Sequence, residues 1–288
     1  MLTPKAILIA LLGAAGIAFV VFWVVQVRGA TGRRRPTLRQ LGIGIVTDFC
    51  DMLGVGSFAP TTSLYKLGGV VADEKIPGTL NVGHMIPTFA EAVISILIIA
   101  VDVEAKTLTL MIGAAAAGAW LGAGVVSGWP RRRIQLGMGV LLVAAVGIMV
   151  ARLTGIVPAG GEALGLSGTR LAIGIAGNFV LGALMTLGIG LFAPCMILVA
   201  LLGMKETAAF PIMMGSCAFL MPVASVRFVR SGRYDLPAAL GLTLGGTPAV
   251  LLAAFVVKSL PLGTVKWLVV VVVVYTAVAM LRSAVRDG

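Results

Sequence analysis

The sequence predicts an all-α polytopic membrane protein made of two inverted-topology repeats. Each repeat contains a re-entrant or broken helix hairpin, and we expect about seven full crossings plus two hairpins. Composition, a repeated helix-breaking motif and the placement of arginines predict this class. Hydrophobic residues make up 59% of the 288 residues and charged residues 11%, whereas soluble domains carry about a quarter charged residues. The mean hydropathy of +1.08 therefore places the chain in a bilayer.

A seven-residue motif occurs twice, as Gly-Val-Gly-Ser-Phe-Ala-Pro at 54–60 and, 134 positions later, as Gly-Ile-Gly-Leu-Phe-Ala-Pro at 188–194. Pro77 and Pro211 keep the same offset. One copy alone would favour simple close crossing of helices through small residues. Two copies at corresponding places favour a binding site, because paired broken helices in two halves are typical of transporters.

Apolar stretches of roughly 20 residues predict membrane-crossing helices. They occupy 5–27, 77–101, 107–129, 134–152, 208–229, 236–257 and 264–281, with hairpins over 40–71 and 170–204. Three crossings in each half make the halves inverted relative to each other. The predicted organisation is a first repeat over 1–130, a second repeat over 131–262, and a final helix with its tail over 263–288.

Arginines cluster at the ends of these segments, at 28–39, 131–133, 227–233 and 282–286. With the crossings above, all four clusters fall on one side of the membrane. The positive-inside bias makes that side cytoplasmic, with the N-terminus outside and the C-terminus inside. The net charge of +11 does not indicate a nucleic-acid partner, because no basic, aromatic-interleaved soluble module is present.

The motif predicts an anion site built from backbone. Pro60 and Pro194 lie where the second arm of each hairpin begins, a first-turn position that proline tolerates well. A helix start presents free N–H groups and the positive end of its dipole, both of which suit an anion. The residues that we expect to bind substrate are Gly54, Gly56, Ser57, Phe58, Thr61, Thr62, Asn81, Gly188, Gly190, Phe192 and Cys195.

Ionisable residues inside a membrane indicate function by default. Asp48 and Asp51 precede the first break, and His84 and Glu91 lie seven residues apart on the next helix. We predict that some of these four couple transport to protons or pair with an ion, because histidine titrates near neutral pH. A hydrogen-bonded core role for His84 stays an alternative. Carboxylates beside an anion site repel the substrate unless they are protonated or paired.

Other classes find no support in the sequence. The three cysteines form no CxxC pair and the chain has one histidine, so neither a metal site nor a disulfide framework is expected. No phosphate-binding loop, catalytic triad in a plausible context or HExxH motif indicates an enzyme or a cofactor. The thirteen methionines look like core filler and not a copper path.

The two breaks, each followed by a proline, and Lys75-Ile-Pro-Gly-Thr-Leu-Asn81 resemble the sulfite exporter TauE/SafE family, also grouped as 4-toluene sulfonate uptake permeases. The resemblance covers about residues 40 to 281. It implies an ion-driven secondary transporter, by name an exporter, of sulfite, sulfonates or sulfoacetate across the bacterial inner membrane without ATP. The symmetric architecture does not itself fix the direction. An anion channel of the same fold, an intramembrane enzyme, a scaffold subunit of a larger complex, and a homodimer stay open.

Overall fold

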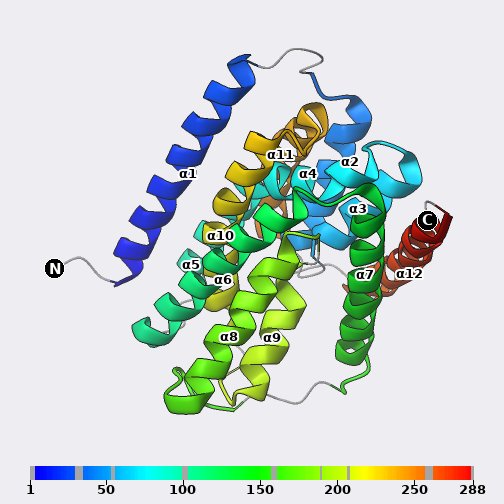
Figure 1. The fold of residues 1–288 in the computed structure, drawn as a ribbon. Coiled ribbons are helices and arrows are strands. Elements are labelled where there is room, and N and C mark those ends of the chain that lie inside the picture. Colours follow the sequence, from blue (N-terminus) through cyan, green and yellow to red (C-terminus); the bar gives the residue numbers. More distant parts are fainter. Residues whose placement is uncertain are drawn as a thin grey trace.

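The computed structural model describes residues 4–29, 35–52, 56–98, 103–156, 161–188, 190–205, 208–256 and 262–286. Within these ranges the chain forms only α-helices, one 3-10 turn (η1) and a single isolated bridge, which confirms the all-α class. The helices are α1 (Pro4–Gly29), α2 (Leu38–Met52), α3 (Phe58–Gly68), α4 (Ile76–Gly83), α5 (Met85–Ile98), α6 (Ala105–Val126), α7 (Arg131–Leu153), α8 (Gly168–Met185), α9 (Phe192–Leu201), α10 (Ala209–Ser231), α11 (Leu236–Val256) and α12 (Leu262–Arg286), with η1 at Asp73–Lys75 (Figure 1).

Six of the described helices are long and apolar enough to cross a membrane: α1, α6, α7, α8, α10 and α11. The protein is therefore a multi-pass membrane protein. α8 belongs to this set although the sequence predicted it as a hairpin arm. The predicted single helix over 77–101 is wrong in one respect, because the structure interrupts it at His84 between α4 and α5. Neither piece alone reaches a spanning length.

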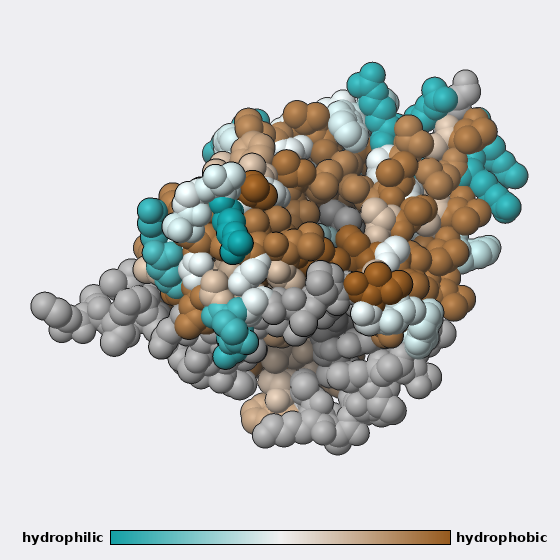
Figure 2. Space-filling model, turned by 90° about the horizontal axis from the view of Figure 1, so that it is seen from below, coloured by the Kyte–Doolittle hydropathy of each residue, from teal (hydrophilic) through white to brown (hydrophobic). Residues whose placement is uncertain are grey.

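The outer surface carries apolar side chains of the kind that face lipid. Ile17, Phe255 and Val271 are 69%, 87% and 64% exposed. Figure 2 shows apolar residues over much of the coloured surface, with hydrophilic residues in separate patches. A water-facing protein rarely exposes so much contiguous apolar area, so this surface agrees with insertion in a bilayer.

One end of the helix bundle gathers arginines from several helices. The guanidinium of Arg39, at the start of α2, donates to the carbonyl of Gly68, at the end of α3, over 3.0 Å. Arg132, at the start of α7, donates to the carbonyl of Ala284 near the end of α12, over 3.1 Å. α2 therefore begins beside the end of α3. We call this part of the bundle the basic end.

Asp73 in η1 ties the basic end together. Its Oδ2 accepts hydrogen bonds from Lys66 at 2.6 Å, Gln135 at 2.9 Å and Arg131 at 3.3 Å. Burial raises the pKa of this carboxyl, but the hydrogen bonds from Gln135 and Lys66 and the positive charges of Lys66 and Arg131 outweigh it and lower the pKa overall. Asp73 thus joins α3 to α7 as an ionised carboxylate.

The opposite end gathers the segments around α8 and α9. The hydroxyl of Thr107, near the start of α6, donates to Glu104 over 2.7 Å and accepts the N–H of Leu166 over 2.8 Å. The N–H of Lys205, beyond α9, donates to the carbonyl of Ala163, ahead of α8, over 2.9 Å. α8 therefore begins beside the end of α9, and Figure 1 shows this pair reaching the end of the bundle away from α2 and α3.

Glycines allow the closest helix contacts. α2 packs mainly on α11, α6 packs on α8 and α10, and α7 packs on α12. A Cβ atom added to Gly44 would lie 2.7 Å from the carbonyl oxygen of Gly241, and one added to Gly122 would lie 2.7 Å from that of Ala183. Larger residues at Gly44 or Gly122 would push these helices apart, and small residues commonly serve this role in membranes.

Candidate functional site

His84 occupies the break between α4 and α5, and Pro87 explains part of that break. Proline has no N–H, so it leaves the carbonyl four residues earlier without its helical donor. That carbonyl belongs to Gly83, and the hydroxyl of Thr243 on α11 donates to it over 2.8 Å. The N–H of His84 still donates to Leu80, and the carbonyl of His84 accepts from Thr88. The interruption is therefore held in place from a neighbouring helix.

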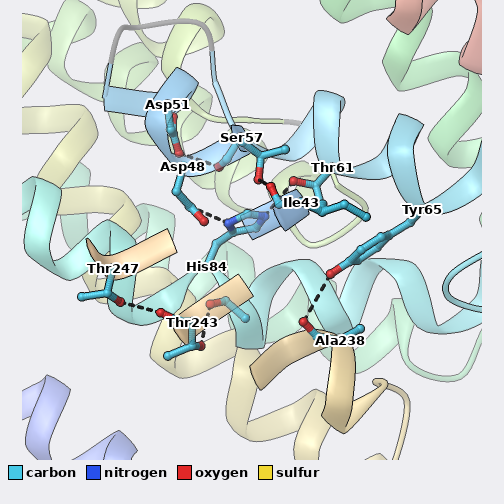
Figure 3. Close-up of polar contacts among 12 residues, drawn as sticks. Ile43, Asp48, Asp51, Ser57, Thr61, Tyr65, His84, Ala238, Thr243 and Thr247 are labelled. Carbon is cyan, nitrogen blue, oxygen red and sulfur yellow. Dashed lines mark hydrogen bonds and ion pairs between the residues drawn. The ribbon is translucent and has the colours of Figure 1, made fainter. Parts of the chain in front are cut away.

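A buried chain of three polar side chains links α2 to α3 through His84 (Figure 3). Nδ1 of His84 lies 2.7 Å from Oδ1 of Asp48 on α2, and Nε2 lies 3.0 Å from the hydroxyl of Thr61 on α3. All three residues are fully buried. The Thr61 hydroxyl can donate to a neutral imidazole or accept from a charged one, so the chain stays bonded in either state.

Asp51 and Ser57 bridge the gap between α2 and α3. The Ser57 hydroxyl donates to Oδ2 of Asp51 over 2.5 Å. Ser57 occupies the N-cap position of α3, yet its side chain makes no capping bond. A serine at the N-cap usually accepts a hydrogen bond from an N–H of the first turn. Here the Ser57 hydroxyl bonds to the Asp51 carboxylate and makes no such capping bond to α3.

A small cavity of about 30 Å³ lies between the α2–α3 pair and the α8–α9 pair. Both pairs and two further helices, α5 and α10, contribute to its wall. The lining residues are Asp51, Gly56, Ser57, Phe58, Thr88, Glu91, Met185, Gly190, Leu191, Met213, Met214 and Cys217. The ring of Phe58 also packs on the imidazole of His84, with centroids 5.6 Å apart.

The cavity wall is acidic. Among the described lining residues two carboxyl groups, those of Asp51 and Glu91, face the cavity and no side chain is basic. Glu91 is 2% exposed and its Oε1 has no hydrogen-bond partner, and Oδ2 of Asp48 also lacks one. Buried polar atoms without partners are uncommon and call for an explanation. Protonation, or an ion or solute in the cavity, would provide one.

The starts of α3 and α9 both reach the cavity, through Phe58 and Leu191. Gly56 has a φ of +91°, in the left-handed region where a side chain adds strain, so the turn into α3 needs glycine there. The first N–H groups of a helix have no acceptor within that helix. Two positive dipole ends thus meet two carboxyl groups at one small space.

The structure brings many of the predicted site residues together. Gly56, Ser57, Phe58 and Gly190 line the cavity beside the predicted coupling residues Asp51 and Glu91, while Asp48, His84 and Thr61 form the chain described above. We could not place two predicted residues: Gly54 lies outside the described residues, and the side chain of Phe192 is not described.

Four other predicted binding residues do not line the cavity: Thr62, Asn81, Gly188 and Cys195. Asn81 donates to the carbonyl of Pro77 in its own helix, so its amide is used locally. Within the described ranges the hydroxyl of Thr62 has no hydrogen-bond partner, and Thr62 lies near Gly188. Cys195 is fully buried one turn into α9.

Six cavity residues were not predicted as a set: Thr88, Met185, Leu191, Met213, Met214 and Cys217. The 134-residue offset could have identified two of them, because Met185 corresponds to Asp51 and Leu191 to Ser57. Met213, Met214 and Cys217 lie on one side of α10 and carry no signal that separates them from core residues. Within the described ranges, no three His, Cys, Asp or Glu side chains converge to hold a metal ion.

Comparison with protein-family models, with curated proteins and with solved structures finds no match to this chain. The resemblance to the sulfite exporter family therefore rests on the motifs alone and stays a prediction.

Proposed function

We propose that the protein is a secondary transporter that carries a small anion through the cavity between the α2–α3 and α8–α9 pairs. The observation that carries this proposal is that two helix starts from the two copies of one motif line the same cavity. Broken helices whose N-termini point at a solute near the middle of the membrane are a recurrent transporter design.

The correspondence of the helices at one fixed offset supports an inverted-repeat architecture, as the proposal requires. At the 134-residue offset, α2 corresponds to α8, α3 to α9, α4–α5 to α10, α6 to α11 and α7 to α12. The helix contacts follow the same correspondence. The contact of α2 with α11 becomes the contact of α8 with α6 when each helix is replaced by its counterpart, and the contact of α7 with α12 is unchanged by that exchange. The two pairs open toward opposite ends of the bundle. This correspondence would move the boundary between the halves from residue 130 to the loop after α7.

The pairing of two corresponding helix starts at one cavity favours a carrier over the rival channel. To load substrate, the cavity must open toward one side of the membrane. Two inverted halves can provide that movement by rocking about a fixed site. The positive-inside bias would place the basic end in the cytoplasm, with the N-terminus outside.

The substrate class has two sources of support. The helix starts favour an anion, and the motif resemblance to the exporter family favours a sulfur-containing one. Asp51 and Glu91 oppose an anion while they are ionised, so the proposal requires them to carry protons when substrate binds. Asp48 is hydrogen-bonded to His84 and does not line the cavity.

Binding can be tested first on the unmodified protein. A thermal-shift panel of sulfite, sulfate, thiosulfate, sulfoacetate, taurine and matched carboxylates should show stabilisation by sulfur-containing anions, because a ligand of the folded state raises its stability. Counterflow of the stabilising anion in proteoliposomes should saturate. A unitary conductance in place of counterflow would indicate a channel, and no response to any anion would end the proposal.

The site can then be tested by filling it. Gly190 lines the cavity and a Cβ atom there meets nothing within 4 Å, so Gly190→Leu should insert and fold but abolish counterflow. Gly147→Leu is the matched control, because Gly147 on α7 also has nothing within 4 Å and does not line the cavity. Gly56→Leu should also abolish counterflow, with added backbone strain. Full counterflow in Gly190→Leu would place the site elsewhere.

A further inference from the structure

We propose that the transporter is a proton–anion symporter, with the co-transported protons carried on Asp51 and Glu91. This rests on the proposed function and names its coupling and direction. An inward proton gradient would then drive the anion into the cell, whereas the family name implies export.

Six titratable groups lie in or beside the cavity. Asp51 on α2, Glu91 on α5 and Cys217 on α10 line it, while Asp48 on α2, His84 at the break and Cys195 on α9 lie outside its lining. His84 is the one group in this described set that can carry positive charge. Its Nδ1 bonds to Asp48, so it is engaged there in either protonation state, and no basic side chain among the described lining residues faces Asp51 and Glu91.

The positions of Asp51 and Glu91 fix the sign of the coupling. Both line a cavity of about 30 Å³, so an anion in that space lies against them in surroundings that screen charge poorly. Ionised carboxylates expel the anion, and protonated ones admit it. The one side-chain donor on Asp51 is the neutral Ser57 hydroxyl, and Oε1 of Glu91 has no hydrogen-bond partner among the described residues. Neither carboxylate therefore has a positive side chain from the described part of the chain beside it that would offset its repulsion of the anion.

Mutual enhancement of binding determines the direction of transport. If protonation strengthens anion binding, anion binding strengthens protonation by the same factor, because coupling between two ligands is reciprocal. Protons and anion then occupy the carrier together and leave it together on the side of lower proton activity. A cation would compete with protons for the same carboxylates and would be exchanged against them. The acidic wall thus makes an anion carrier a symporter.

The symport step balances without a further reactant. On the side of higher proton activity each of the two carboxylates gains a proton and the cavity takes up the anion. On the other side the anion leaves and both protons return to water. No covalent bond changes apart from the O–H bonds, and no oxidant or reductant is needed.

The experiment uses the full chain in proteoliposomes loaded with radiolabelled sulfoacetate or thiosulfate for counterflow, and the same anions for accumulation. With the membrane potential clamped and the outside one pH unit more acidic, the anion should accumulate about a hundredfold, because each of the two coupled protons contributes a factor of about ten per pH unit. In detergent, the thermal shift caused by the anion should be larger at pH 6 than at pH 8, which tests the linkage without any substitution.

Asp51→Asn, Glu91→Gln and the double variant report on the proton carriers. The readout is the ratio of accumulation to counterflow. This ratio should fall in each single variant and fall further in the double variant, which should show almost no accumulation. Glu74→Gln is the matched control, because Glu74 is a carboxylate of η1 outside the cavity. If the double variant does not fold, the pH dependence of the thermal shift in the unmodified protein still decides the question.

Two results would overturn symport while leaving the proposed function in place. One is saturable counterflow with no response to the pH gradient. The other is loss of internal anion when the outside is acidic, which is antiport. Absence of both counterflow and thermal shift for every anion of the panel is a different failure, and it would remove the proposed function itself.

Discussion

The hydroxyl of Thr243 on α11 donates, over 2.8 Å, to the carbonyl of Gly83 that Pro87 leaves without a helical donor. Gly83 also lets α11 approach closely, because a Cβ atom there would lie 2.7 Å from Cδ1 of Leu242. The break that positions His84 therefore depends on α11. Thr243 lies 160 residues after Gly83, so a segment distant in the sequence holds this break in place.

We expect Thr243→Val to lower the free energy of unfolding by about 1–3 kcal/mol, because it leaves a buried carbonyl unpaired at nearly constant shape. Thr243→Ser keeps the hydroxyl and should lose less. Thermal unfolding in a mild detergent measures both. A valine variant as stable as the unmodified protein would show that the Gly83 carbonyl finds another donor.

The bond between Asp48 and His84 should contribute to stability. His84→Gln removes the imidazole from a fully buried carboxyl group, and a buried polar group left without its partner costs about 1–3 kcal/mol. Asp48→Asn combined with His84→Gln restores a neutral hydrogen-bonded pair and should recover much of the stability. A double-mutant cycle on thermal unfolding tests this. Additive losses would contradict direct coupling between the two side chains.

His84 should also influence the pH profile of transport. If its imidazole exchanges protons with the cavity through Asp48, His84→Ala should flatten that profile, measured as counterflow from pH 5 to pH 9. If Asp51 and Glu91 alone carry the coupling, the profile should keep its shape and only the maximal rate should fall. The symport inference predicts the second outcome, and a flat profile would make His84 part of the proton path.

Much of the helix layout follows from the sequence because long apolar runs are local signals. The predicted segments 208–229 and 236–257 match α10 and α11 to within a few residues. The interruption at His84 was missed because it depends on Pro87 together with a distant threonine, Thr243. A proline three residues after a histidine indicates a kink, but not which helix satisfies the freed carbonyl.

The site shows the same division between local and distant signals. The repeated motif predicted that Gly56 and Gly190 would meet, and both line the cavity. The sequence placed His84 and Glu91 seven residues apart on one predicted helix, but the two side chains have different surroundings, since His84 bonds to Asp48 and Glu91 faces the cavity. Asn81 was predicted to bind substrate, yet its side-chain amide donates a hydrogen bond to the carbonyl of Pro77 in its own helix.

Asp73 gives a prediction for stability against pH. Its pKa is lowered in the folded state, despite burial, by the bonds from Gln135 and Lys66 and the charge of Arg131. A lowered folded pKa means that the contribution is fully present above the unfolded pKa, near 3.8, and is lost as pH falls through the folded value. Asp73→Asn should therefore destabilise the protein at pH 7 and much less at pH 3.

Thermal unfolding of the Asp73→Asn variant and of the unmodified protein at the two pH values measures this difference. Glu104→Gln at the opposite end serves as a comparison, since Glu104 accepts one side-chain hydrogen bond, from Thr107. We expect a loss of about 1–3 kcal/mol at pH 7 for Asp73→Asn, as for hydrogen bonds to charged groups. Equal losses at both pH values would mean that shape, and not charge, holds η1 to α7.

Cys217 allows the cavity to be probed directly, because it is the one cysteine among the described lining residues. Cys195 is fully buried behind it, and Cys50 is partly exposed on α2. In a Cys50→Ser background, a small anionic methanethiosulfonate reagent should inactivate transport, and bound anion should protect against it. Reaction requires the cavity to open, so inactivation should be faster during turnover than at rest. Cys217→Ala should abolish inactivation by the reagent, and Cys195→Ala should not. The reverse pattern would show that the substrate passes behind the start of α9 and not through the cavity between the α2–α3 and α8–α9 pairs.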